Sequence, residues 1–199
     1  MDQILPASFY ERPVVEVARD LLGKKLVRII DGRRVAGMIC ETEAYDGETD
    51  QACHARVGRT NRNSVMYGKA GQAYVYFTYG MHWMLNCVCG PLGYPAAVLI
   101  RSLIPLEGLE IIAGRREGIR QADWCSGPAR LTRALSIERQ CNGLDVTVAQ
   151  NGLFLETYMN IPDRLVKSTP RIGIQYAGEP WVSLPWRFVI QDHSQISTS

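Results

Sequence analysis

The sequence lacks any apolar run long enough to cross a membrane, and it has little excess of charge. None of its hydrophobic segments approaches the about 20 residues that a membrane-spanning helix needs. Its first residues, MDQILPASFYERP, lack the basic start and apolar core of a secretory signal peptide. The formal net charge is only +2, so a polyanionic partner would have to be bound by a local patch. These absences predict a cytoplasmic protein with no membrane partner.

The six cysteines form no C-x-x-C pair, which is the spacing that most structural zinc sites use. A zinc site made from Cys53, His54, Cys87 and Cys89 is therefore a minor alternative. Cys40 lies, like Cys87 and Cys89, in an apolar segment typical of a strand. We expect reduced, mostly buried thiols, and neither a metal nor a cofactor.

The hydrophobic pattern predicts one α+β domain over residues 1–199. The length suffices for one full core but not for two large domains, and the sequence shows no internal repeat or linker. Pro13 and Gly23 mark the start and stop of a helix, and the Asp31-Gly32 pair predicts a hairpin turn. Strands are expected at 24–30, 33–45, 71–79, 82–90, 96–104, 152–158 and 171–178, and further helices at 105–116 and 128–136.

Two acids and a tyrosine alternate along the segment CETEAY. On a strand, Glu41, Glu43 and Tyr45 would share one face, with the two acids roughly 7 Å apart. Inverting glycosidases separate their two acids by about 6.5–9.5 Å, but these acids must flank the scissile bond, which two acids on one strand do not. A glycosidase for free sugars is therefore a distant alternative. An ordinary exposed strand face would explain Glu41.

The segment AYVYFTYGMHWMLN is rich in aromatic residues. Tyr74 and Tyr76 share one strand face, and packing in the core is the simpler explanation for Tyr74. Gly80 predicts a bend that leaves Tyr79 at an exposed tip, where its ring could insert between bases. Asn86 lies further along, and as a buried polar residue it could simply be bonded to the backbone.

A long polar stretch from 46 to 71 separates two predicted strands, and its length alone makes it a functional candidate. It carries Arg56, Arg59, Arg62 and Lys69, with no acid between residues 52 and 69. A solvated loop face would also explain such a run. Beside exposed aromatics, however, the pattern favours phosphate binding.

A second candidate for phosphate binding lies in the segment CSGPARLTR. Ser126 could cap the helix that follows and present its N-terminal amides to a phosphate. Arg130 falls in the first turn of that helix. We therefore include both residues in a predicted DNA-binding surface.

Five blocks of sequence occur in a fixed order between residues 21 and 188. They are ETEAYDGETDQACHARVGRT, AYVYFTYGMHWMLN, VLIRSLIPLEG, CSGPARLTRAL, and RIGIQYAGE followed by PWRF. Together they resemble the alkyladenine (3-methyladenine) DNA glycosylase family of bacteria and mammals. The resemblance implies a single compact domain with a curved antiparallel sheet, surrounding helices and a hairpin that enters the DNA minor groove.

The resemblance also implies an activity in base excision repair. Family members flip damaged purines out of double-stranded DNA and hydrolyse the N-glycosidic bond. The implied substrates are 3-methyladenine and 7-methylguanine, with hypoxanthine and ethenoadenine as further candidates. The blocks contain no candidate lysine nucleophile, so a monofunctional enzyme without strand cleavage is expected. We also expect a monomer. A damage-binding protein without catalysis is the main alternative.

Position by position, the resemblance assigns a role to seven residues. Glu43 matches the general base, and Arg101 matches the arginine that helps to hold the attacking water. Tyr45 and Tyr76 match the rings that enclose the flipped base. The remaining matches are His54, which closes the pocket, Tyr79, which fills the vacated stack, and Asn86, which obstructs the amino group of guanine.

Overall fold

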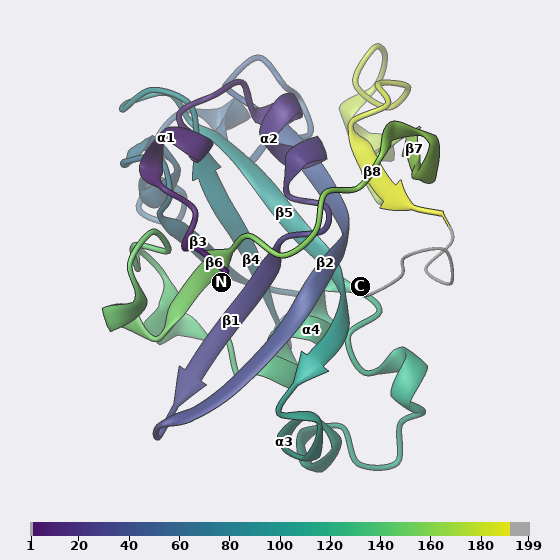
Figure 1. Cartoon of the computed structure of the whole chain (residues 1–199). Helices are drawn as coiled ribbons and strands as arrows, with labels where there is room; N and C mark the ends of the chain where they lie inside the picture. The colour runs from purple at the N-terminus through teal and green to yellow at the C-terminus, as the bar shows by residue number, and fades with distance from the viewer. Residues whose placement is uncertain (1, 192–199) are drawn as a thin grey trace.

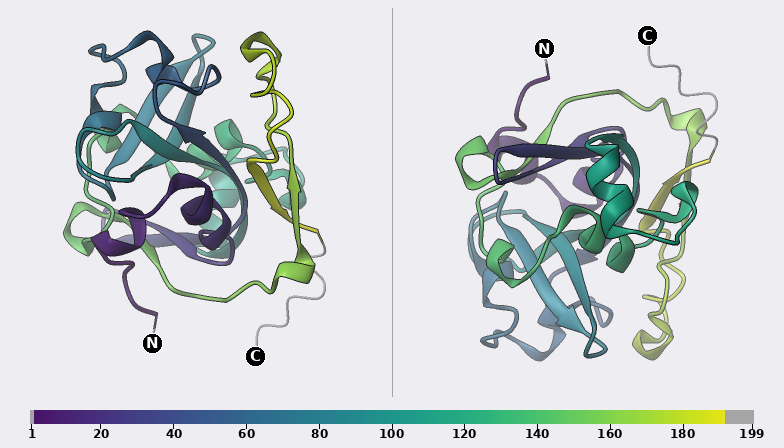
Figure 2. Two further views of the ribbon diagram at one scale, coloured as in Figure 1. Left: turned by 90° about the horizontal axis from the view of Figure 1, so that it is seen from above. Right: turned by 90° about the horizontal axis from the view of Figure 1, so that it is seen from below.

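A strongly curved antiparallel sheet dominates the computed structural model, which describes residues 2–191 (Figure 1). Within these residues the strand order is β3-β4-β5-β2-β1-β6, and β8 pairs with both β2 and β7. The strands are β1 Lys25–Ile30, β2 Arg33–Asp46, β3 Ala73–Thr78, β4 His82–Cys89, β5 Ala96–Glu107, β6 Leu153–Glu156, β7 Val166–Thr169 and β8 Arg187–Ile190. The segment that carries β7 and β8 runs along one side of the sheet (Figure 2).

Short helices surround the sheet. The α-helices are α1 Ala7–Tyr10, α2 Val14–Asp20, α3 Leu109–Arg115 and α4 Pro128–Leu135. The 3-10 helices are His54–Val57, Ser64–Tyr67, Gln121–Asp123, Arg139–Cys141, Ala149–Asn151, Asp163–Leu165 and Gln175–Ala177. No helix within residues 2–191 has the length and apolar character to span a membrane.

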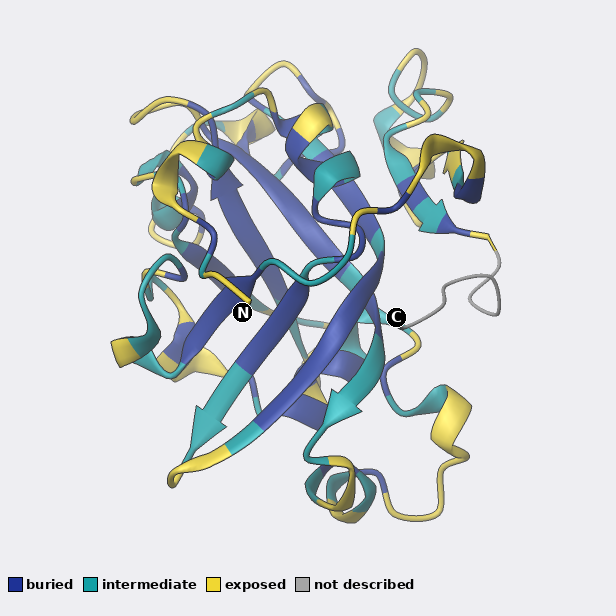
Figure 3. Cartoon of the chain, in the orientation of Figure 1, coloured by how far each residue is buried: buried dark blue, intermediate teal, exposed yellow. Residues whose placement is uncertain are grey.

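The two longest strands, β2 and β5, form the centre of the sheet. Their middle sections are buried, whereas the ends of the hairpins are exposed (Figure 3). In this pair Glu43 lies opposite Leu99, and the register shifts on both sides of Glu41. A bulge of this kind bends a strand and redirects a side chain, and it lies next to the candidate catalytic acid.

The predicted single α+β domain with a curved antiparallel sheet is confirmed, as are the helix after Pro13 and the hairpin at Asp31. All six cysteines are free and buried. The helix expected from residue 105 begins only at Leu109, because β5 continues to Glu107. The irregular pairing at Pro105 accommodates a residue that has no N–H to donate to the sheet.

The strand predicted at 171–178 is wrong. This segment is a loop with one 3-10 turn, Gln175–Ala177. Gly173 and Gly178 have φ values of 75° and 66°, which an extended strand does not allow. The loop instead closes one side of the site described next.

Candidate active site

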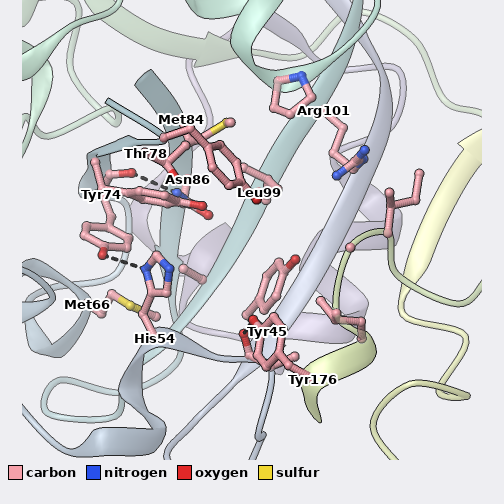
Figure 4. A pocket seen from close by; sticks show the side chains of 18 residues that line it. Tyr45, His54, Met66, Tyr74, Thr78, Met84, Asn86, Leu99, Arg101 and Tyr176 are labelled. Carbon is pink, nitrogen blue, oxygen red and sulfur yellow. Dashed lines mark hydrogen bonds between the residues drawn. The ribbon is translucent and has the colours of Figure 1, made fainter. Parts of the chain in front are cut away.

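A cavity of about 280 Å³ lies between the β3–β4 hairpin, the central strands and the loop 171–178. The pocket brings together five residues singled out in the sequence. They are Tyr45, His54, Tyr76, Asn86 and Arg101, and Tyr79 lies at the rim. Tyr45 and His54 lie on opposite sides of the pocket (Figure 4). Residues from distant parts of the chain therefore converge on one concave site.

The candidate catalytic acid, Glu43, lies directly behind the pocket wall. Its side chain has no exposed surface, and Arg101 Nη1 lies 3.2 Å from its Oε2. The Tyr45 hydroxyl donates to Oε2 at 2.8 Å, and the backbone N–H of Ile172 donates to Oε1 at 2.8 Å. A buried carboxylate needs such partners. Its surroundings therefore fix its orientation toward the wall that Tyr45 and Arg101 form.

A buried ion pair supports the ring of Tyr45 from behind. Arg171 and Asp50 are both fully buried, with Arg171 Nη2 donating to Oδ1 of Asp50 at 2.9 Å. The same guanidinium lies 4.8 Å from the centre of the Tyr45 ring. Burial and the neighbouring Glu43 keep the pKa of Tyr45 well above its ordinary value. Tyr45 therefore presents a fixed, neutral ring to the pocket.

Three aromatic side chains form the opposite side of the pocket. His54 Nδ1 lies 2.9 Å from the hydroxyl of Tyr74. The rings of His54 and Tyr76 meet edge to face, with centroids 4.5 Å apart. Burial, with smaller contributions from Arg62 and Arg56, lowers the pKa of His54 to about 4. The imidazole is therefore neutral near pH 7. Tyr74 is buried as expected, but its contribution to the pocket was missed.

Asn86 forms part of the same wall from β4. It is 4% exposed, and its Nδ2 donates to the carbonyl oxygen of Tyr74 at 3.0 Å (Figure 4). The bond to the backbone that was the alternative explanation for Asn86 is therefore present. Within the described residues, no hydrogen bond satisfies its Oδ1. The backbone bond fixes the amide in the pocket wall, where a base could meet it.

The tip of the β3–β4 hairpin is exposed, as its Tyr-Gly pair predicts. Tyr79 is 83% exposed and Met81 is 68% exposed. Tyr79 and Gly80 have φ values of 52° and 67°, the pattern of the tight turns that match the twist of a hairpin. A large ring thus extends into solvent next to the pocket mouth.

The four cations between β2 and β3, Arg56, Arg59, Arg62 and Lys69, are here called the cationic loop. Within residues 2–191, none of the four lies within ion-pair distance of a carboxylate. Arg56 stacks on the ring of Tyr176, with its guanidinium 4.8 Å from the ring centre, and Arg62 donates to the carbonyl oxygen of Phe77 at 3.2 Å. Their charges remain available to an anionic partner.

The expected cap at Ser126 is wrong. Gly127 occupies the N-cap position of α4 and provides no side-chain bond. Ser126 Oγ instead donates to Asp123 Oδ1 at 3.3 Å and accepts from Arg130 Nη1 at 2.8 Å. Arg130 also pairs with Asp123 at 3.1 Å. A phosphate at this position would compete with that carboxylate, so DNA binding here stays a prediction.

Glu41 does not lie on an exposed strand face. Its side chain is 13% exposed and pairs with Arg101 and Arg187. The alternative zinc ligands do not converge either, since no three potential metal-binding side chains cluster within the described residues.

Comparison with known proteins places these residues in a family. Residues 8–194 match the model of the methylpurine-DNA glycosylase family. A relative from Methanocella arvoryzae is 51% identical over 93% of this chain and 91% of its own. One from Carboxydothermus hydrogenoformans is 44% identical over 98% of both chains. Both relatives are provisionally named 3-methyladenine DNA glycosylase. The match over nearly the full length shows that this chain belongs to the methylpurine-DNA glycosylase family.

Proposed function

We propose that this protein excises methylated purines from double-stranded DNA by hydrolysing the N-glycosidic bond. The observation that carries the proposal is a buried acid, Glu43, directly behind an aromatic pocket that Arg101 also lines. An aromatic pocket alone would only bind a base. A carboxylate that meets an arginine at the wall of this pocket adds a group able to activate water.

The pocket suits a purine that carries positive charge. Methylation at a ring nitrogen leaves the base cationic, and aromatic faces attract cations by about 0.5–2 kcal/mol each. Tyr45 and Tyr76 offer such faces, and His54 adds no competing charge because its pKa is about 4. We propose 3-methyladenine and 7-methylguanine as the main substrates, with hypoxanthine and ethenoadenine as further candidates.

In the proposed mechanism, Glu43 accepts a proton from a water molecule while the oxygen of this water attacks C1′ of the flipped nucleotide. The bond between C1′ and the purine nitrogen breaks, and its electron pair leaves with the base. Because Glu43 has no exposed surface, the water must reach it from the pocket, past the residues that contact this acid and line the pocket, Tyr45, Arg101 and Ile172. The attack consumes water rather than a lysine, so we propose that the DNA strand remains uncut.

Two further features of the chain serve DNA binding in this proposal. Tyr79 fills the space that the flipped nucleotide leaves, since its ring extends freely from the hairpin tip. The cationic loop contacts phosphates around the lesion. Asn86 obstructs the 2-amino group that guanine has and adenine lacks, so unmodified guanine is rejected. 7-Methylguanine is still released because its cationic ring is already a good leaving group. We propose that the protein acts as a monomer.

The test is the release of free base from DNA that has been treated with a methylating agent. The proposal predicts release of 3-methyladenine and 7-methylguanine, while untreated DNA of the same sequence yields none. Specific binding without release would instead establish a damage-binding protein. Hydrolysis of free glycosides without action on DNA would establish the glycosidase alternative.

A further inference from the structure

Both carboxylate oxygens of Glu41 accept hydrogen bonds, although Glu41 does not line the pocket. Its Oε1 accepts from Nε of Arg101 at 2.8 Å and from Nε of Arg187 at 2.6 Å. Its Oε2 accepts from the hydroxyl of Ser102 at 3.0 Å. Burial opposes its charge, but the two arginines outweigh this effect and lower the pKa of Glu41. Glu41 is therefore ionised and held on both oxygens.

One guanidinium joins the two acids of β2. Arg101 directs Nε to Glu41 at 2.8 Å, while its Nη1 lies 3.2 Å from Oε2 of Glu43. The guanidinium is planar, so anchoring Nε determines where the remaining N–H groups point. Arg101 also lines the pocket. Glu41 thus sets the direction of a group that faces the reaction space.

The fold brings Glu41 to Arg101 through the irregular pairing of β2 with β5. The register shifts both before and after Glu41. Arg187 reaches the same carboxylate from β8 and also donates to Oγ1 of Thr169 at 3.1 Å. Three strands therefore meet at Glu41, and two cations share its charge.

We propose that Glu41 is a positioning residue for base excision, which anchors Arg101 so that this arginine serves Glu43 and the attacking water. The inference rests on the proposed function. Without the charge of Glu41, Arg101 would keep Glu43 as its only ion-pair partner within residues 2–191, and Arg187 would have none there. Arg101 would then turn to bind Glu43 through two N–H groups, and the acid would accept a proton from water less readily.

If the ion pairs of Glu41 only stabilised the packing of the strands, replacement of Glu41 would give a different result. The replacement would then lower stability and affect lesion binding and excision alike. Glu107 provides a matched control, since it accepts from Lys25 at 3.0 Å and from Arg34 at 2.6 Å near the other end of β5. This carboxylate also serves two cations, but it does not line the pocket.

The experiment measures single-turnover excision and lesion affinity separately. Glu41→Gln should lower the excision rate about tenfold or more while it changes lesion affinity less than about twofold. Glu41→Asp retains the charge and should recover part of the rate. Glu107→Gln should excise at the wild-type rate. In an Arg101→Lys background, which lacks the Nε anchor, Glu41→Gln should cause little further loss.

A second measurement does not depend on activity. The Nε–H signal of Arg101 in a nitrogen-15 NMR spectrum should exchange slowly with water in the wild type and rapidly in Glu41→Gln. An unchanged exchange rate would overturn the positioning role, as would equal losses of affinity and excision rate. A wild-type protein that releases no base would instead refute the proposed function, while the NMR result would still decide whether Glu41 anchors Arg101.

Discussion

Side chains of the pocket are held by partners within the chain, whereas those of the rim that we propose to bind DNA extend into solvent. Glu43 has three polar partners and no exposed surface. Tyr79, at the hairpin tip, is 83% exposed. The cationic loop has no acid within ion-pair distance among residues 2–191. The acid is thus held by partners within the chain, whereas the side chains of the rim are exposed and their charges are not neutralised within residues 2–191.

This difference separates two kinds of energetic contribution. Preorganised groups lower the barrier of the chemical step because their orientation is settled during folding. Exposed groups contribute mainly to encounter and affinity, since their contacts form on binding. Changes in the pocket should therefore alter the excision rate, whereas changes at the rim should alter DNA affinity and its salt dependence.

The largest effect is expected at the acid. Glu43→Gln should reduce single-turnover excision by about 10²–10⁴-fold, because an amide cannot accept the proton of water. Lesion binding should remain close to that of the wild type, since the side chain keeps its size. If this variant excised at the wild-type rate, Glu43 would not be the general base, and the proposed difference between pocket and rim would be wrong.

At the rim, Tyr79→Ser should weaken binding of lesion DNA by roughly 10–100-fold. Unstacking a base costs a few kcal/mol, and the serine would leave the gap unfilled. Tyr79→Phe is the matched control and should bind like the wild type, because only the hydroxyl is removed. A Tyr79→Ser variant with unchanged affinity would show that another side chain occupies the gap. Fluorescence of a base analogue in the DNA measures flipping directly.

Within the pocket, Asn86→Ser should alter discrimination rather than overall rate. Shortening the side chain opens the space beside the 2-amino group, so excision of guanine and its lesions should rise about tenfold. Excision of adenine lesions should change less. The measurement is the excision rate of guanine and of adenine lesions by both proteins, in duplexes that differ only at the target base. If the variant folds and excises adenine lesions but still ignores guanine, the selectivity arises elsewhere in the pocket.

The smallest effects are expected in the cationic loop. Replacing Arg59 or Lys69 by Ala should weaken binding a few-fold and reduce the slope of log K against log salt by about 0.9 for each phosphate that the variant no longer neutralises. Glu41 and Arg101, which are paired within the chain, should not contribute to this slope. Titrations at several salt concentrations measure it. A slope that no loop variant changes would place the phosphates on another surface.

The sequence predicted the local parts of the site well. Alternation along a strand puts Glu43 and Tyr45 on one face, and the structure joins them by a hydrogen bond. The Tyr79-Gly80 pair predicted an exposed turn, which is present. Each of these features depends on neighbouring residues, so a short stretch of sequence contains the necessary information.

Predictions failed where a contact or an element boundary depends on distant segments. Helix α1 and strands β7 and β8 were missed because they are short and lack a clear periodic pattern. The segment 171–178 has the apolar alternation of a strand, yet its glycines and its position beside Glu43 make it a loop. Glu41 looked like a surface residue because its partner Arg187 lies far along the chain.

What the sequence alone determined was the family, the α+β class, the hairpin and the set of chemical groups available for catalysis. Only the tertiary structure decided how these groups are held. The curvature and the bulge of the sheet bring Arg101 and Arg187 to Glu41, and the returning chain brings the Ile172 amide to Glu43. The physical reason is the distance along the chain over which each effect acts. Backbone preferences depend on only a few neighbouring residues. The pairing of buried charges depends on how the whole chain closes around them.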